Sequence, residues 1–224
     1  QQSAFNLREL MDGKKILLIN LSKGRLGDIN AYLIGMILVG KILMASLSRT
    51  DIPQEERSDF YLYIDEFQNF ITDSISTILS EARKYRLDLT IAHQYMGQLV
   101  EKQETKIRDA VLGNAGTMVS FRIGVEDAEI LEKEYAPIFN KYDLVNIEAY
   151  HAYVKLLIKN QASRPFTLKT VPLSPGNVEL AEKIRALSRL KYGRDRKIVE
   201  QEILDRVMKV EKVVEEPAPI DWKL

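Results

Sequence analysis

The chain lacks cysteine altogether, and its 32 basic residues are balanced by 32 acidic ones. The absence of cysteine excludes disulfides and argues against zinc or iron–sulfur sites. A net charge of zero gives no global argument for nucleic-acid or membrane binding, so local groups of residues must carry any such argument. With 46% apolar and 29% charged residues, the composition is that of a soluble globular protein.

No glycine-rich phosphate loop of the form GxxxxGK[ST] occurs in the 224 residues. The sequence does contain the usual partner of that loop. In Phe60-Tyr-Leu-Tyr-Ile-Asp-Glu-Phe67 an apolar run ends in two adjacent carboxylates, Asp65 and Glu66. If the run is a buried parallel strand, both acids lie at the carboxyl edge of the sheet, where ligands of open α/β sheets bind. One carboxylate there can hold Mg²⁺ through its water shell, and the next can orient a water for attack on a phosphate. The alternative is a strand that ends on a solvated acid pair.

Gln94 strengthens the catalytic interpretation because it follows the next apolar strand in the sequence. Adjacent parallel strands end on the same edge, and an amide there can donate to a γ-phosphate oxygen while accepting from the attacking water. Gln98 is a weaker substitute, and an ordinary polar strand end is the alternative.

Strands and helices alternate over about the first 135 residues, which predicts an α/β fold with a parallel sheet and flanking helices. The expected strands are 15–21, 60–64, 87–92 and 117–123, and the expected helices are 28–48, 74–85 and 127–135, with Asp28 as an N-cap and a loop at 22–27. The long apolar run 31–47 is at the lower length limit for a membrane span and contains Lys41, which favours a helix buried against the sheet.

The C-terminal part has a different pattern. Runs at 150–158 and 165–171 predict a β-hairpin, and 177–192 and 195–213 predict helices. The junction 189–197 holds five basic residues, which either contact phosphates or form a solvated helix end. The expected division is a core over 1–172, a helical appendage over 173–214 and a flexible tail over 215–224.

Several other residues are candidates for binding. Arg83 lies on a predicted helix and Arg122 at a strand end, and either guanidinium can stabilise a transferring phosphoryl group in a neighbouring subunit. Lys23 and Arg25 lie in a glycine-flanked loop that is too short to be a phosphate loop, and they either contact DNA or are solvated. Strand-end residues are further candidates to line a pore around DNA: Gln68, Asn69 and Tyr95.

The segments FYLYIDEFQNF and ILSEARKYRLDLTIAHQYMGQL, with NLSKGRLG and GTMVSFRIGVEDAEIL, give a combined pattern more specific than any single motif. Over about Phe5 to Pro172 the chain resembles the coupling ATPases of type IV secretion and conjugation (the TraG/TraD type), within the HerA/FtsK superfamily of hexameric DNA translocases. The resemblance departs from the family in the missing Walker A residues and in Arg86, where such sequences often have glycine.

The resemblance implies a RecA-like P-loop NTPase core that acts as a hexameric ring around DNA, with ATP and Mg²⁺ as cofactors. It implies that Asp65 and Glu66 are the Walker B pair, Gln94 a sensor and Arg83 an inter-subunit finger. Because Walker A is missing, this piece alone should not hydrolyse ATP. The start at Gln1 suggests a fragment of a cytoplasmic protein, which a missing N-terminal part would attach to the inner membrane and to the secretion or conjugation machinery. The alternatives are a non-hydrolysing scaffold on a degenerate RecA-like fold and a HerA-type chromosome-processing translocase.

Overall fold

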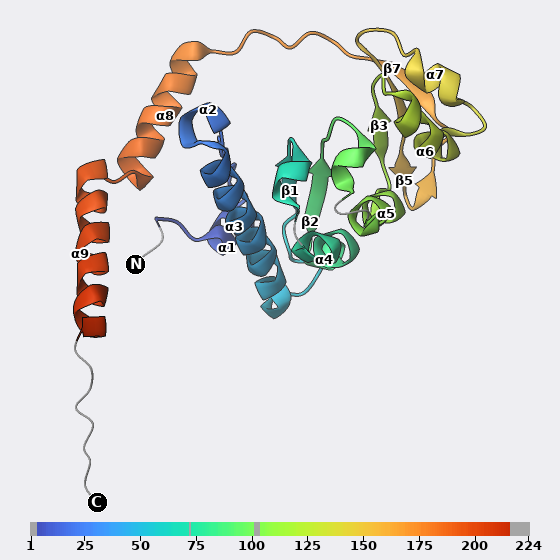
Figure 1. The fold of residues 1–224 in the computed structure, drawn as a ribbon. Helices are drawn as coiled ribbons and strands as arrows, with labels where there is room; N and C mark the ends of the chain where they lie inside the picture. Colours follow the sequence, from blue (N-terminus) through green and yellow to red (C-terminus); the bar gives the residue numbers. More distant parts are fainter. Residues whose placement is uncertain (1–3, 72, 101–103, 216–224) are drawn as a thin grey trace, which may run out of the picture. The chain divides into compact units, whose positions relative to one another are not determined.

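The computed structural model of the chain describes residues 4–71, 73–100 and 104–215 (Figure 1). Residues 216–224 of the expected tail lie outside the described residues. The chain divides into two compact units, one formed by residues 6–173 and the other by residues 1–5 together with 174–224.

The larger unit begins with helices. They are α1 (Leu7–Asp12), the single turn α2 (Lys23–Leu26), the long α3 (Asp28–Leu47) and the 3₁₀ turn η1 (Ser48–Asp51). The predicted loop at 22–27 is therefore largely helical. Asp28 is the first residue of α3 rather than its cap, because Gly27, with a φ of 77°, supplies the turn into the helix. At that position its carboxylate favourably meets the positive end of the helix dipole.

Two parallel strands carry the acid pair, as predicted. β1 (Phe60–Ile64) pairs with β2 (Leu87–Ile91), with Phe60 opposite Leu87 and Ile64 opposite Ile91. The connection between them consists of η2 (Phe67–Phe70), α4 (Asp73–Glu81) and η3 (Ala82–Tyr85). Figure 1 shows the two strands side by side.

One face of this pair is covered and the other is bare. Ile64 and Leu87 are buried in a core that also contains Val39 and Ile42 of α3 and Ile78 of α4. On the opposite face the side chains alternate outward, and the tyrosines at 61 and 63 are 60% and 72% exposed. Parallel sheets are normally covered on both faces.

The predicted first strand is wrong. Residues 15–21 form no strand, and Ile16 and Leu18 are 89% and 86% exposed. A strand exists only where a neighbour accepts its backbone hydrogen bonds, and no described segment pairs with these residues. Their apolar character alone could not reveal this.

The predicted third strand also differs from expectation. It is shorter, β3 (Met118–Ser120), and it joins no parallel sheet. It pairs antiparallel with β4 (His151–Lys155), which pairs in turn with β7 (Phe166–Lys169). An apolar run predicts burial but does not identify the partner strand, and here the predicted hairpin provides the partner. The expectation of an all-parallel sheet is thus correct only for β1 and β2.

The remaining elements of this unit are η4 (Met96–Leu99), α5 (Lys106–Asn114), α6 (Val125–Tyr135), α7 (Lys141–Val145) and the short hairpin of β5 (Leu157–Ile158) and β6 (Gln161–Ala162). Met96, Leu99 and Val111 of η4 and α5 belong to the first core. Ala128, Tyr135, Leu144 and Ile147 form a second core, against which Met118 and Tyr153 of the second sheet pack. Burial raises the pKa of Tyr135 to about 12.

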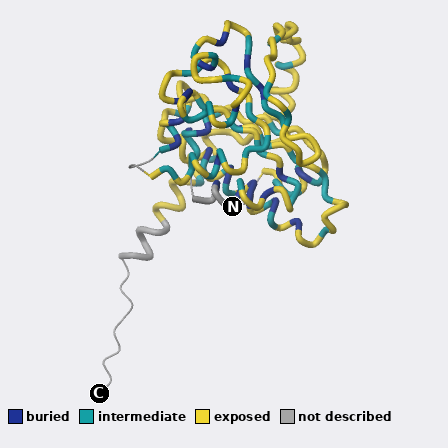
Figure 2. The backbone as a smooth tube through the Cα atoms, turned by 90° about the vertical axis from the view of Figure 1, so that its right-hand side faces the viewer, coloured by how far each residue is buried: buried dark blue, intermediate teal, exposed yellow. Residues whose placement is uncertain are grey.

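The smaller unit contains α8 (Val178–Tyr192) and α9 (Arg196–Glu215), close to the predicted helices. Asn177 caps α8 by accepting from the amide of Leu180 at 2.9 Å. The basic junction is partly neutralised, because Arg194 pairs with Glu202 and Arg196 pairs with Glu200. Figure 2 shows the burial of each described residue along the backbone, with exposed positions in yellow and buried ones in dark blue.

The helix at 28–51 is long and apolar enough to cross a membrane by length and composition, and 33% of its most apolar window is buried. Core helices of soluble proteins meet the same criterion. One face of α3 packs in the core through Val39, Ile42 and Leu43, which agrees with the expected packing against the sheet. The other face is exposed at Ile29, Leu33 and Met44, so the helix is not fully buried.

Candidate nucleotide site

The carboxyl ends of β1 and β2 form a shared edge, and it holds the acid pair and Gln94. The ladder continues past the strands, because the amide of Ala92 donates to the carbonyl of Ile64 at 3.0 Å and the amide of Phe67 donates to that of Ala92 at 2.9 Å. Asp65 and Glu66 therefore follow the end of β1 at the same edge of the sheet at which β2 ends and the chain continues to Gln94.

Glu66 is held by amide side chains on both carboxylate oxygens. Nε2 of Gln94 donates to Oε1 at 2.9 Å, and Nε2 of Gln68 donates to Oε2. The bond from Gln94, then the bond from Gln68 and the charge of Lys23, hold the pKa of Glu66 below its ordinary value. Glu66 itself has a φ of 50°, a left-handed conformation that turns the chain sharply after β1.

Asp65 is exposed, and its Oδ1 accepts from the backbone amide of Glu66 at 3.0 Å. The described residues contain no group of three or more His, Cys, Asp or Glu side chains that could hold a metal ion. A single outward carboxylate fits Mg²⁺, which keeps several waters and is bound through one or two carboxylates together with substrate phosphates.

Three candidates for DNA contact lie beside this edge: Gln68, which donates to Glu66, and Asn69 and Lys23. Nδ2 of Asn69 donates to the carbonyl of Glu66 at 3.0 Å, and Nζ of Lys23 donates to Oδ1 of Asn69 at 3.2 Å. The turn η2, which carries Asn69, is held by Phe70 against α3. A Cβ atom at Gly35 would lie 2.1 Å from the Phe70 ring, so only glycine allows this close approach.

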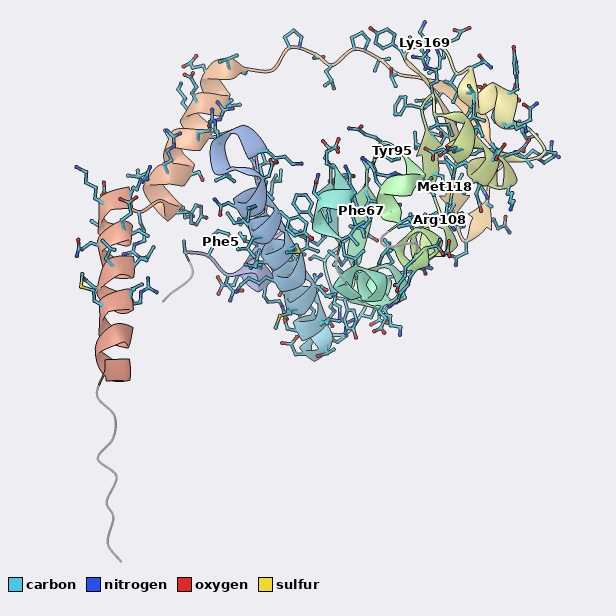
Figure 3. All side chains as sticks on the ribbon, in the orientation of Figure 1. Phe5, Phe67, Tyr95, Arg108, Met118 and Lys169 are labelled. Atoms are coloured by element: carbon cyan, nitrogen blue, oxygen red, sulfur yellow. The ribbon has the colours of Figure 1, made fainter. Side chains whose placement is uncertain are left out.

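The loop after β2 is shaped by Gln98, whose Oε1 accepts from the amides of Gln94 and Tyr95 at 3.0 and 3.2 Å. The next amide, of Met96, donates to the buried Asp127 at 3.1 Å. Gln98 thus has a local structural contact at this edge. Tyr95 is 54% exposed and projects from this loop (Figure 3).

The two candidate finger arginines do not reach this edge. Arg83 lies on η3, before β2, and therefore at the amino end of the parallel pair. Its Nη2 donates to Oδ1 of Asn160, at the tip of the β5–β6 hairpin, at 3.1 Å. Arg122 follows β3 and is exposed, and no hydrogen bond or ion pair is found for it among the described residues. A trans role for either residue needs a second subunit.

Arg86 follows η3 in a left-handed backbone conformation. It has a φ of 56°, and its amide closes η3 by donating to the carbonyl of Arg83 at 3.2 Å. Its guanidinium lies 3.3 Å from Asp59. The helix therefore ends in a left-handed turn that glycine adopts without strain.

Two further contacts could not be predicted from the sequence. The bond from Gln68 to Glu66 arises because η2 folds back over the acid pair, and the spacing of two residues gives only a weak hint of it. The bond from Arg83 to Asn160 spans 77 residues and leaves no local signal in the sequence.

Comparison with known proteins gives one family match. Residues 59–144 match the family described as the TraM recognition site of TraD and TraG, which covers β1, the acid pair, Gln94 and the chain as far as α7. No curated protein matches the chain.

Among solved structures, the plasmid coupling protein TrwB in complex with ADP and Mg²⁺ is similar over 69% of this chain and 38% of its own, with a TM-score of 0.53 and 16% identity. TrwB in complex with a non-hydrolysable GTP analogue covers 65% of this chain and 37% of its own, with a TM-score of 0.49 and 16% identity. The chain resembles the conjugative coupling proteins. At this identity the match to TrwB with ADP and Mg²⁺ shows an α/β fold with a parallel sheet and helices, and the chain spans 38% of that coupling protein.

Proposed function

We propose that this chain is part of an ATP-driven DNA-translocating motor of the conjugative coupling class, and that it carries the acid-pair half of a RecA-like nucleotide site. The single observation that supports this most is the shared edge, where Gln94 contacts the carboxylate of Glu66 at 2.9 Å and Asp65 faces outward beside it. The family match over 59–144 and the fold shared with a coupling protein solved with ADP and Mg²⁺ add support.

In this proposal each residue at the edge has a distinct task. Glu66 orients the attacking water and Asp65 holds the Mg²⁺ shell, while Gln94 reports the γ-phosphate. A bound Mg²⁺ would neutralise charge on the phosphates. Because both oxygens of Glu66 are held by amides, its carboxylate is already oriented before a nucleotide arrives.

The remaining parts of the motor lie outside this edge. The phosphate loop would come from a segment beyond these 224 residues, and a neighbouring subunit in a hexameric ring would supply Arg83 or Arg122. The core over 1–172, an appendage over 173–214 and a tail over 215–224 would form the part of the protein described by this sequence. The partners would be DNA and the conjugation machinery, at the cytoplasmic face of the inner membrane.

The bare face of the parallel pair supports the view that further structure covers it. Parallel sheets are buried on both faces, and two strands alone are marginal in water. Apolar surface that a larger α/β sheet would cover is exposed at the tyrosines at 61 and 63 and, within 15–21, at Ile16 and Leu18.

The test is to measure both ATP hydrolysis and ATP binding in variants of the full-length protein. Glu66→Gln should lower ATP hydrolysis by at least a hundredfold, because an amide cannot serve as base, and it should leave ATP binding nearly unchanged because the two side chains have the same shape. Glu179→Gln in α8 is a control with the same chemical change on an exposed helix. Unchanged turnover in Glu66→Gln would remove the motor assignment.

A second candidate is a non-hydrolysing scaffold on the same fold. If no other segment of the protein supplies a phosphate loop, its absence favours this candidate, since the 224 residues contain no GxxxxGK[ST] motif. In that case the full-length protein would bind no ATP analogue, and Glu66→Gln would change nothing.

A further inference from the structure

Lys23 lies beside the edge that carries the acid pair, to which Asn69 connects it. Its ammonium donates to Oδ1 of Asn69 at 3.2 Å, and Asn69 donates onward to the carbonyl of Glu66 at 3.0 Å. A residue 43 positions before Glu66 is therefore joined to the acid pair through a single side chain. Its charge also helps to hold the pKa of Glu66 down, after the hydrogen bonds from Gln94 and Gln68.

The positive charge of Lys23 is not neutralised by a contact. Within the described residues its ammonium has Asn69 as hydrogen-bond partner and no carboxylate within 4.0 Å. An amide oxygen accepts a hydrogen bond but leaves the net charge in place. The side chain is exposed, so an incoming anion can replace Asn69 as its partner.

Arg25 provides an internal comparison, since it lies two residues further along the same turn, α2. Residues two apart on a helix face different sides. Arg25 is exposed and has no contact with the acid-pair edge among the residues that the structure describes. The two basic residues, equivalent in the sequence, are thus separated by the fold.

We propose that Lys23 belongs to the nucleotide site, where its ammonium binds a phosphate oxygen of the nucleoside triphosphate, while Arg25 remains a candidate DNA contact. The inference rests on the proposed function, because it places the triphosphate at the edge formed by Asp65, Glu66 and Gln94. A lysine is suited to this role, since a compact ammonium with three donors binds phosphate as a point charge. Asn69 then serves as its resting partner when no nucleotide is bound.

The experiment compares Lys23→Met with Arg25→Met in the full-length protein, since methionine keeps a long flexible side chain and removes the charge. Two quantities are measured: equilibrium binding of a fluorescent non-hydrolysable ATP analogue with Mg²⁺, and DNA binding as a function of salt concentration. Lys23→Met should weaken analogue binding about tenfold to hundredfold, the loss expected for one charge-assisted hydrogen bond, with the salt dependence of DNA binding unchanged. Arg25→Met should do the reverse and lower the salt slope by about 1.

Lys23→Arg and the thermal unfolding midpoint guard against a folding artefact. The arginine variant keeps the charge and should retain analogue affinity within about fivefold, corresponding to a change of about 1 kcal/mol. Analogue binding within twofold of wild type in Lys23→Met would overturn the inference. So would a reduced salt slope in Lys23→Met at an unchanged unfolding midpoint, because Lys23 would then contact DNA, and so would an arginine variant that binds as poorly as methionine.

Failure of the proposed function would look different. In that case the wild-type protein would not bind the analogue, and Glu66→Gln would not alter turnover. A protein that binds and hydrolyses ATP through Glu66, yet does not respond to Lys23→Met, would leave the motor assignment standing and overturn only the role of Lys23.

Discussion

The two ends of the β1–β2 pair hold polar side chains in opposite ways. At the carboxyl end, Glu66 and Lys23 contact neutral amides and remain accessible to solvent. At the amino end, Arg49 is fully buried and donates to the carbonyls of Tyr85 and Ser58. Charges at the first end can exchange partners, whereas the charge at the second is enclosed by the fold. This difference distinguishes the candidate nucleotide site at the carboxyl end from a structural contact at the amino end.

The largest effect is expected from substitution of Arg49, which tests whether the amino end of the β1–β2 pair has a structural role. Arg49→Met leaves two partly buried carbonyls without their donor and removes the ion pair to Asp12, whose Oδ1 lies 3.0 Å from Nε of Arg49. We expect the free energy of unfolding to fall by about 3–5 kcal/mol, measured by urea denaturation. Arg57→Met at the same end is the control, because Arg57 is less buried and donates to the carbonyls of Ile52 and Lys84. Equal losses in the two variants would contradict the distinction.

Substitution of Gln94 tests whether the carboxyl end of the β1–β2 pair takes part in ATP hydrolysis. Gln94→Ala should lower ATP turnover by about a hundredfold, the usual effect of removing one donor aimed at developing charge. Its stability should change by less than about 0.5 kcal/mol because the side chain is exposed. Thr90→Ala, on the bare face of β2, is the control and should keep full turnover. A turnover within twofold of wild type in Gln94→Ala would show that Gln94 contacts Glu66 without sensing a nucleotide.

Two glycines of α3 offer a matched pair. A Cβ at Gly35 would meet the Phe70 ring at 2.1 Å, whereas a Cβ at Gly40 would find no atom within 4 Å. Gly35→Ala should destabilise by about 1–3 kcal/mol and displace η2 with Asn69. Gly40→Ala should stabilise by roughly 0.5–1 kcal/mol, because alanine loses less backbone entropy in a helix. Thermal unfolding of both variants checks the pair, and the same sign for both would show that Phe70 does not fix η2.

Arg83 is the exception at the amino end, because Asn160 holds it through a neutral amide, as at the carboxyl end. If Arg83 completes a neighbour's site, Asn160→Gly should lower turnover about fivefold, equivalent to one hydrogen bond of about 1 kcal/mol. Glycine keeps the left-handed turn, since Asn160 has a φ of 62°.

Lys159→Gly is the control, since Lys159 shares this turn with a φ of 49° and does not contact Arg83. The effect of Asn160→Gly should vanish in an Arg83→Ala background. An undiminished effect there would show that Asn160 acts independently of Arg83.

Much of the fold follows from local patterns. The apolar runs predicted β1 and β2, the helix expected over 74–85 corresponds to α4 and η3, and the runs at 150–158 and 165–171 predicted the hairpin of β4 and β7. What failed was pairing. Residues 15–21 have the composition of a strand but no partner, and β3 found an antiparallel partner instead of a parallel one. Strand pairing depends on segments distant in sequence, which periodicity does not report.

The candidate site shows the same limit. The proximity of Glu66 and Gln94 could be predicted because parallel neighbours end at a common edge. The approach of Lys23 to Asn69 could not, because it depends on how α2 and η2 pack across 46 residues and on the space left by Gly35. In the sequence Lys23 and Arg25 are equivalent candidates, and the structure distinguishes them because Lys23 contacts Asn69.

The most direct test of the central claim is a structure of the full-length protein with Mg²⁺ and a non-hydrolysable ATP analogue. We predict that the γ-phosphate lies at the carboxyl edge of β1 and β2, within hydrogen-bond distance of the Gln94 amide, with Asp65 in the Mg²⁺ shell. An analogue bound elsewhere, with Glu66 still held by Gln68 and Gln94 and no phosphate near them, would contradict the account.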